Sequence, residues 1–183
     1  GLGVFGSEGR GTCDHYGLLD KVEMVMGTFS KSLASVGGFI AADAETINYM
    51  KHAVRPYIFT ASISPASTAS VLAALHIIRT EPERQAALWD IQRYAIKSFS
   101  DLGFEIGNTS TPIIPLYVRD NEKTFAATRM LLDAGVFISP VVAPAVRDDE
   151  TLVRVALMAT HTKEQIDFGV EQIYKTFKQL EIL

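Results

Sequence analysis

Short apolar runs alternate with helical segments along this chain, and this alternation limits its fold more than any other feature. Strands are predicted at 22–26, where the apolar run ends at Gly27, and at 37–42, which follows a turn. A helix that is buried on most sides is predicted at 65–79, because its residues are almost continuously apolar. Strands that alternate with helices indicate an α/β fold for this first part.

A proline is expected to end one helix of the first part. Ile47, Met50 and Val54 recur at helical spacing, and Pro56 follows directly. The sequence therefore predicts a helix that stops before Pro56 and an extended segment at 57–60.

The pattern changes near residues 81–83, which predicts a domain boundary. A stripe of apolar residues then follows one face of a helix that ends at Gly103. The stripe consists of Leu88, Ile91, Ala95, Phe99 and Leu102. Further strands are predicted at 113–118, 136–139 and 152–158, with a helix at 121–133. We expect two domains, an α/β part at 1–83 and a small α+β domain at 84–183.

The last helix has the strongest signal. Thr162 and Gln165 have the spacing of a capping box, which marks the first turn of a helix. Apolar residues follow at steps of three and four and predict one buried face: Ile166, Val170, Ile173, Phe177 and Leu180.

Composition excludes several classes of protein. With 48% hydrophobic and 21% charged residues, the chain can form a core and is not disordered. A net charge of -4 without a basic run argues against nucleic acid as a partner. There is no apolar stretch of about 18 residues, so no transmembrane segment is expected. The single cysteine, Cys13, excludes an internal disulfide and favours a cytoplasmic location, and the histidines show no metal-ligand spacing.

One lysine lies between the first two predicted strands, among small hydroxyl residues. A phosphate-binding P-loop needs glycine directly before its lysine, but Ser30 precedes Lys31. A lysine in a mostly apolar site can instead form a Schiff base with an aldehyde cofactor. The hydroxyls of Thr28 and Ser30 could then hold the phosphate of that cofactor. A surface lysine in a polar loop is the alternative that the spacing leaves open.

Residues 27–39, GTFSKSLASVGGF, resemble the lysine motif of the α-oxoamine synthases, which are pyridoxal 5'-phosphate (PLP) enzymes of the fold-type I aminotransferase superfamily. The similarity continues through 3–6, 55–60, 153–155 and 159–162 and covers essentially the whole chain. It implies that 1–83 form the C-terminal part of the PLP-binding large domain and that 84–183 form the small C-terminal α+β domain.

The resemblance also implies a role for four residues. Lys31 would bind PLP as a Schiff base and then move the proton at the amino acid's α-carbon. Thr28 would contact the cofactor phosphate, and Thr60 would reach the phosphate of the neighbouring subunit, so that a homodimer shares its active sites. Arg154 would bind the substrate carboxylate, since a planar guanidinium suits that group.

The implied reaction is a decarboxylative condensation of an amino acid with an acyl-CoA. Similarity is greatest to the bacterial members that use L-serine and a long-chain acyl-CoA. Members that make 8-amino-7-oxononanoate or transfer acetyl groups to glycine are alternatives. A non-catalytic partner subunit is a candidate from another class, against which Lys31 and Arg154 both argue. A plain acyl-CoA-binding or nucleotide-binding module is a third candidate.

The chain departs from the family in one respect. In the family an Asp-Glu-Ala-His sequence directly precedes the glycine-rich stretch, and its Asp pairs with the pyridine nitrogen of PLP. That sequence is not in these 183 residues. We therefore expect a fragment, the C-terminal half of a longer enzyme, that is not catalytic alone.

Overall fold

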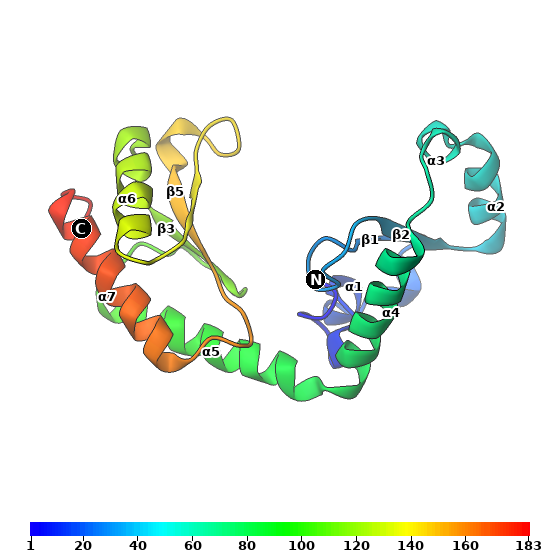
Figure 1. Ribbon diagram of the computed structural model, residues 1–183, viewed down its shortest axis with the longest axis horizontal. Helices are drawn as coiled ribbons and strands as arrows, with labels where there is room; N and C mark the ends of the chain where they lie inside the picture. The colour runs from blue at the N-terminus through cyan, green and yellow to red at the C-terminus, as the bar shows by residue number, and fades with distance from the viewer. The chain divides into compact units, whose positions relative to one another are not determined.

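The computed structural model describes residues 1–183 and divides into two compact units, Gly1–Gln85 and Ala86–Leu183 (Figure 1). Each unit is described by itself. The domain boundary predicted near 81–83 lies slightly before the division after Gln85. The prediction follows the start of helix α5 (Pro82–Asp101), whose first residues still belong to the first unit. The identity of the two parts as a large and a small domain remains a prediction.

The first unit opens with a glycine-rich segment that is folded back on itself. It holds the short helices η1 (Ser7–Gly9), α1 (Thr12–His15) and η2 (Leu19–Lys21). The Asp14 carboxylate accepts hydrogen bonds from the Ser7 backbone N–H at 2.6 Å and from the Ser7 hydroxyl at 2.9 Å. These bonds hold the pKa of the Asp14 carboxyl below its ordinary value.

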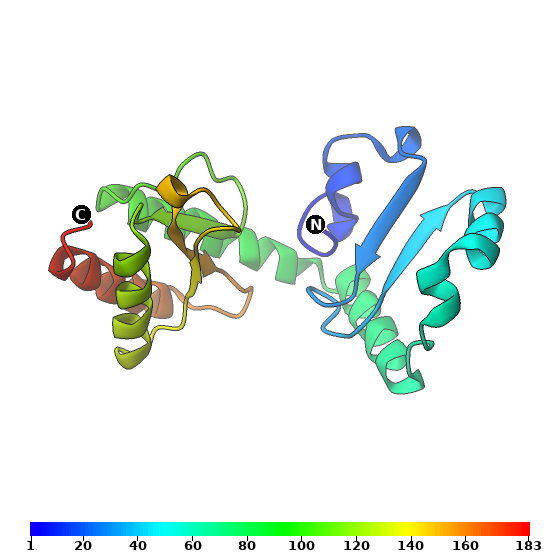
Figure 2. The ribbon, with the colours of Figure 1, turned by 90° about the horizontal axis from the view of Figure 1, so that it is seen from above.

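A β-hairpin follows, formed by β1 (Met24–Thr28) and β2 (Gly38–Ala42), which run antiparallel and side by side (Figure 2). Gly27 pairs with Phe39, and the Phe39 ring covers it so closely that a Cβ on Gly27 would lie 2.3 Å from the ring. The Phe39 ring also stacks on Phe29, with their centroids 6.0 Å apart. Only glycine therefore fits at position 27 while the ring keeps this place.

Three helices complete the first unit. The Asp43 side chain caps α2 (Ala44–Ala53) by accepting from the Thr46 N–H at 2.8 Å, and the Ser64 hydroxyl caps α4 (Pro65–Thr80). Between them lies α3 (Arg55–Phe59), where an extended segment was predicted from Pro56. That prediction is wrong because Pro56 occupies the first turn of a new helix, a position where its missing N–H costs nothing.

The first unit buries little apolar surface. The prediction that α4 is buried on most sides is wrong, because few elements of this unit pack against it and only Val71 of the helix is buried. Of the twenty buried hydrophobic residues in the chain, only Leu33 and Val71 lie in it. Several large apolar side chains remain exposed instead, including Met26 at 72% and Phe59 at 80% of their surface.

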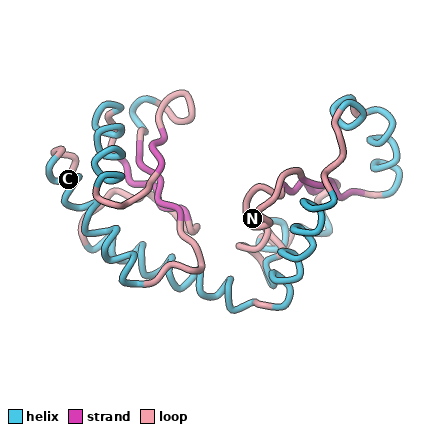
Figure 3. Tube along the Cα trace, viewed as in Figure 1, coloured by secondary structure: helices cyan, strands magenta, loops and turns pink.

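The second unit is a three-stranded antiparallel sheet packed against helices. The strand order is β3 (Ile113–Tyr117), β5 (Leu152–Ala156) and β4 (Ser139–Val141), and the strands are magenta in Figure 3. Helices α5, α6 (Asn121–Asp133) and α7 (Lys163–Gln179) supply the apolar residues that pack with the sheet, and η3 (Asp148–Glu150) precedes β5. Ile114, Leu116 and Val153 are fully buried in this core.

The predicted last helix is confirmed, except that Leu180 follows its last residue and is only half-buried. The Thr162 hydroxyl accepts from the Gln165 N–H at 3.3 Å, and the Gln165 side chain accepts from the Thr162 N–H at 3.0 Å, which completes the capping box. Ile166, Val170 and Ile173 are buried along the helix, as their spacing indicates.

Several strand boundaries differ from the prediction. The strand predicted at 22–26 is β1 at Met24–Thr28, because its pairing with β2 begins at Met24 and continues to Thr28. The strand predicted at 113–118 ends one residue earlier, at Tyr117.

The strand predicted at 136–139 begins only at Ser139, because pairing with β5 starts opposite Arg154 and leaves Phe137 83% exposed outside the ladder. The strand predicted at 152–158 ends at Ala156. None of the helices has the length and apolar character needed to cross a membrane.

Candidate functional site

Lys31 lies on the turn that joins β1 to β2. The turn is held at its base by the Phe29 N–H, which donates to the Gly37 carbonyl at 2.9 Å, and across its middle by the Ser35 N–H, which donates to the Phe29 carbonyl at 2.8 Å. The Ala34 N–H donates to the Lys31 carbonyl at 3.0 Å. The backbone of Lys31 is therefore fixed within the hairpin while its side chain extends outward.

Two hydroxyls stand directly before Lys31. The oxygens of Thr28 and Ser30 are 3.0 Å apart and share a hydrogen bond, and the Ser30 N–H donates to the Thr28 hydroxyl at 3.3 Å. Both residues are exposed, so these groups can turn toward an anionic ligand. The structure thus brings Thr28, at the end of β1, close to Ser30 and Lys31 on the turn that follows.

The surroundings of Lys31 differ from the expected apolar site. Its side chain is exposed, it makes no ion pair, and it lies outside the apolar hollow next to the hairpin. That hollow, of about 650 Å³, lies between the hairpin and helices α2 and α3 and includes Thr28 among its lining residues. The residues of the first unit alone do not enclose the lysine, because few of its side chains form a core.

Thr60 follows α3 and is exposed. Its hydroxyl donates a hydrogen bond to the Pro56 carbonyl and so ends the short helix. The three residues before it, Tyr57, Ile58 and Phe59, are each more than half exposed. Thr60 is thus placed on an apolar part of the surface, on a different element from Lys31.

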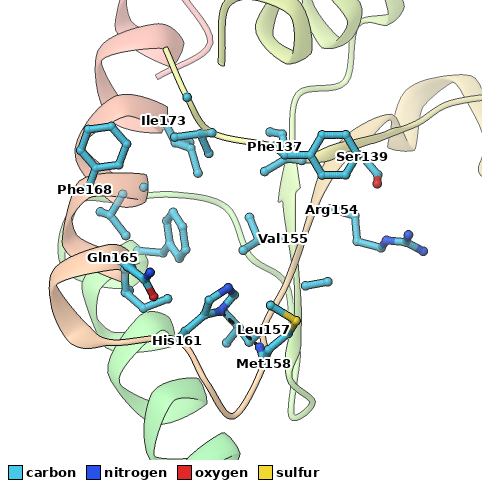
Figure 4. Close-up of a pocket in the computed structure, with 18 of the residues that line it drawn as sticks. Phe137, Ser139, Arg154, Val155, Leu157, Met158, His161, Gln165, Phe168 and Ile173 are labelled. Atoms are coloured by element: carbon cyan, nitrogen blue, oxygen red, sulfur yellow. Dashed lines mark hydrogen bonds between the residues drawn. The ribbon is translucent and has the colours of Figure 1, made fainter. Parts of the chain in front are cut away.

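Arg154 belongs to the second unit and lies in the middle of β5, opposite Ser139 on β4 and Pro115 on β3. Its side chain is exposed and points away from Phe168 and Ile173 of α7 (Figure 4). The strand alternation explains this, since the neighbours Val153 and Val155 face the helices.

Arg154 is the one arginine of the second unit that has no acidic partner. Ion pairs are formed by the other four, which are Arg93, Arg119, Arg129 and Arg147. The pairing of Arg119 with Glu105, for example, lowers the pKa of the Glu105 carboxyl. An exposed, unpaired guanidinium is suited to bind an anion from solution.

Two hollows of the second unit meet at Arg154. The larger, of about 790 Å³, lies between β5, the segment before β4 and the first half of α7, and is lined mainly by apolar side chains such as Phe137, Leu157 and Phe168 (Figure 4). The smaller, of about 480 Å³, lies against the other face of the sheet and includes Tyr117. Arg154 therefore places a charged guanidinium at the edge of two hollows, the larger of which has mainly apolar lining residues.

Reasoning from the sequence missed one polar contact in the larger hollow. His161 Nδ1 accepts a hydrogen bond from the Met158 N–H at 3.2 Å in the turn between β5 and α7. No pattern in the sequence pairs these residues, because the contact depends on how the turn closes. No group of acidic, histidine or cysteine side chains is arranged to hold a metal ion.

Comparison with known proteins gives the relatives of this chain. Residues 2–173 match the aminotransferase class I and II family. The chain is 63% identical over 183 residues to a serine palmitoyltransferase of Bacteroides ovatus, and 40% identical to an 8-amino-7-oxononanoate synthase of Alkaliphilus oremlandii. In each case all of this chain and 46% of the relative are covered, so the chain spans less than half the length of these relatives.

Solved structures give the same result for the fold. A serine palmitoyltransferase from S. paucimobilis with a bound PLP-myriocin aldimine superposes with a TM-score of 0.93 at 29% identity. The match covers all of this chain and 46% of that one. A Sphingomonas wittichii serine palmitoyltransferase matches with the same TM-score and coverage. The predicted mixed α/β fold is confirmed by these matches.

Proposed function

Because this chain belongs to the aminotransferase class I and II family, we propose that the protein it forms is a PLP-dependent acyltransferase that condenses L-serine with a long-chain acyl-CoA, a serine palmitoyltransferase. The observation that carries the proposal is Lys31 on the β1–β2 turn, next to the hydroxyls of Thr28 and Ser30. The similarity to serine palmitoyltransferases over the full chain supports the choice within the family.

The residues of the turn fit the cofactor. PLP carries an aldehyde and a phosphate, and Lys31 offers an amine free of any ion pair while Thr28 and Ser30 offer hydroxyl donors for the phosphate. When bound, PLP supplies the electron sink that stabilises a carbanion at the α-carbon of an amino acid. Lys31 would hold the cofactor and then move the α-proton.

Arg154 has the properties needed to bind the carboxylate of the amino acid. It is exposed and has no ion pair, and a guanidinium can hold a carboxylate through two parallel hydrogen bonds. Orientation of the amino acid by such a pair lowers the entropic cost of reaching the acyl-CoA. The condensation forms the new carbon–carbon bond with loss of CoA and carbon dioxide and leaves a 2-amino ketone.

Thr60 supports the proposal of a homodimer with shared active sites. It lies on an exposed apolar part of the first unit, where contact with a second subunit would bring its hydroxyl to the cofactor phosphate of that subunit. Nucleic acid is not proposed as a partner, since the net charge is -4. A cytoplasmic location stays a prediction from the single cysteine.

These proposals concern the whole protein, because the chain spans 46% of its relatives. We propose that the 183 residues alone do not turn over substrate, since the family's Asp-Glu-Ala-His sequence is not among them. Measured turnover by the purified chain would contradict this.

The test uses the full-length protein with added PLP. We expect a visible absorbance band of lysine-bound cofactor that is absent in Lys31→Ala and retained in Lys21→Ala, a matched control at an exposed lysine before β1. Product formation is then compared for serine, alanine and glycine with short and long acyl-CoAs. A band that survives Lys31→Ala would refute the role of the lysine, and a preference for alanine would favour the 8-amino-7-oxononanoate synthase activity instead.

A further inference from the structure

The end of β5 after Arg154 has a partner strand along only one edge. β5 pairs with β3 from Leu152 to Ala156, but with β4 only as far as Arg154. On the β3 side, the Leu157 N–H donates to the Pro112 carbonyl at 2.9 Å. Because backbone groups of an antiparallel strand point alternately to its two edges, the next N–H, that of Met158, faces the edge without a strand.

His161 supplies an acceptor at this open edge. Its Nδ1 accepts from the Met158 N–H at 3.2 Å, and its own backbone N–H donates to the Met158 carbonyl at 3.1 Å (Figure 4). The imidazole thus accepts from the Met158 N–H in place of the backbone carbonyl that a neighbouring strand would supply at this edge. A ring nitrogen accepts only when it carries no proton, so this contact requires a neutral ring with its proton on Nε2.

Few other contacts fix this turn. Met158 is 57% exposed and Thr160 is exposed, so neither side chain anchors the turn in the core. The capping box at Thr162 fixes the far end of the turn, where α7 begins. At the near end, Leu157 is buried and bonded to Pro112 on the β3 side. The bond from Met158 to His161 Nδ1 is the side-chain contact that holds the opposite edge, four residues after Arg154.

We propose that His161 is a positioning residue: it fixes the end of β5 and so sets the direction in which Arg154 presents its guanidinium to a carboxylate ligand. Both side chains line the larger hollow of the second unit. The identity of the ligand, an amino acid, rests on the proposed function, whereas the hydrogen bond to Met158 does not depend on it.

The experiment compares His161→Ala with His161→Asn in the full-length protein. The asparagine side-chain oxygen stands close to where Nδ1 stands and can accept from the same N–H, whereas alanine cannot. His76→Ala is the matched control, since His76 lies exposed on α4 in the other unit. Four quantities are measured: hydrogen exchange of the Met158 amide, the ring tautomer of His161 by NMR in the unsubstituted protein, and both KM and kcat for the amino acid.

In His161→Ala we expect Met158 exchange to be about tenfold faster and KM for the amino acid to rise about tenfold, with kcat changed less than about threefold, as loss of one hydrogen bond would give. His161→Asn should restore both quantities to within about threefold. The wild-type ring should carry its proton on Nε2.

Unchanged Met158 exchange in His161→Ala overturns the proposal, and so does faster exchange with an unchanged KM. A failure of His161→Asn to recover either quantity also overturns it, because a merely structural loss would not depend on the acceptor. Arg154→Gln separates this outcome from a failure of the proposed function: if it leaves amino-acid binding unchanged, the carboxylate role of Arg154 is wrong whatever His161 does.

Discussion

Replacing Gly27 by alanine should disturb the lysine turn, because the Phe39 ring occupies the space of the new side chain. The added Cβ would lie 2.3 Å from Cε1 and 2.6 Å from Cζ of Phe39. Carbon atoms in contact lie about 3.5 Å apart, so the ring must move by about 1 Å or more. The ring is 37% exposed and can swing outward, but it then loses its stacking on Phe29.

We expect Gly27→Ala to lower the free energy of unfolding by about 1–3 kcal/mol, the usual cost of overpacking. About 0.5–1.5 kcal/mol of this is the lost contact between the Phe39 and Phe29 rings. Because Thr28 follows directly in the chain, the affinity of the full-length protein for PLP should fall as well.

A double-mutant cycle with Phe39→Ala tests this reasoning. Urea unfolding of the full-length protein is measured for both single variants and for the double variant. Without the ring, Gly27→Ala should cost less than about 0.5 kcal/mol, so that the two changes are coupled by about 1 kcal/mol or more. Additive effects within about 0.3–0.5 kcal/mol would refute the idea that the ring is the reason for glycine at this position.

Three further predictions concern stability. Gly169→Ala should raise the free energy of unfolding by about 0.5–1 kcal/mol, because Gly169 lies inside α7 and a Cβ there meets no atom within 4 Å; unfolding in urea shows the gain, and a loss would mean that the position is covered. Phe177→Ala should cost about 3–5 kcal/mol, since Phe177 is 1% exposed and packs against Phe104, and a loss below about 1 kcal/mol in the same assay would contradict this packing. Because hydrogen bonds from Ser7 lower the pKa of Asp14 in the folded state, their stabilisation is present above the unfolded pKa and is lost as the pH falls through the folded one; amide exchange of Ser7 should show this loss at acid pH, and Asp14→Ala should abolish the pH dependence.

The most predictable parts of the fold are those specified by local chemistry. Thr162 and Gln165 satisfy each other's backbone donors within one turn, so their spacing alone identifies the start of α7. The turn that carries Lys31 likewise lies between two short apolar runs, which are consecutive in the sequence and pair with each other as β1 and β2. The candidate residues Thr28 and Lys31 could be placed close together for the same reason.

Features that depend on distant partners could not be predicted in this way. The start of β4 at Ser139 is decided by where β5 offers a partner, and apolar residues 136–138 carry no sign that they lie outside the ladder. A proline such as Pro56 can either end one helix or lie in the first turn of the next. The second case holds here because Val54 is extended and caps α3, which the sequence alone does not show. The exposure of Lys31 follows from the scarcity of core residues around it, which no local pattern records.

The small core of the first unit links cofactor binding to folding. Within these 183 residues, Leu33 and Val71 are the only buried hydrophobic residues of this unit, so in the isolated chain it should open at a lower free energy than the sheet that carries Arg154. A ligand that binds only the folded lysine turn stabilises this turn by mass action. The stabilisation grows as the concentration of the ligand rises above its dissociation constant. Under the proposed function, PLP would in this sense stabilise the lysine turn itself, and the turn of the purified chain should gain protection from hydrogen exchange when PLP is added.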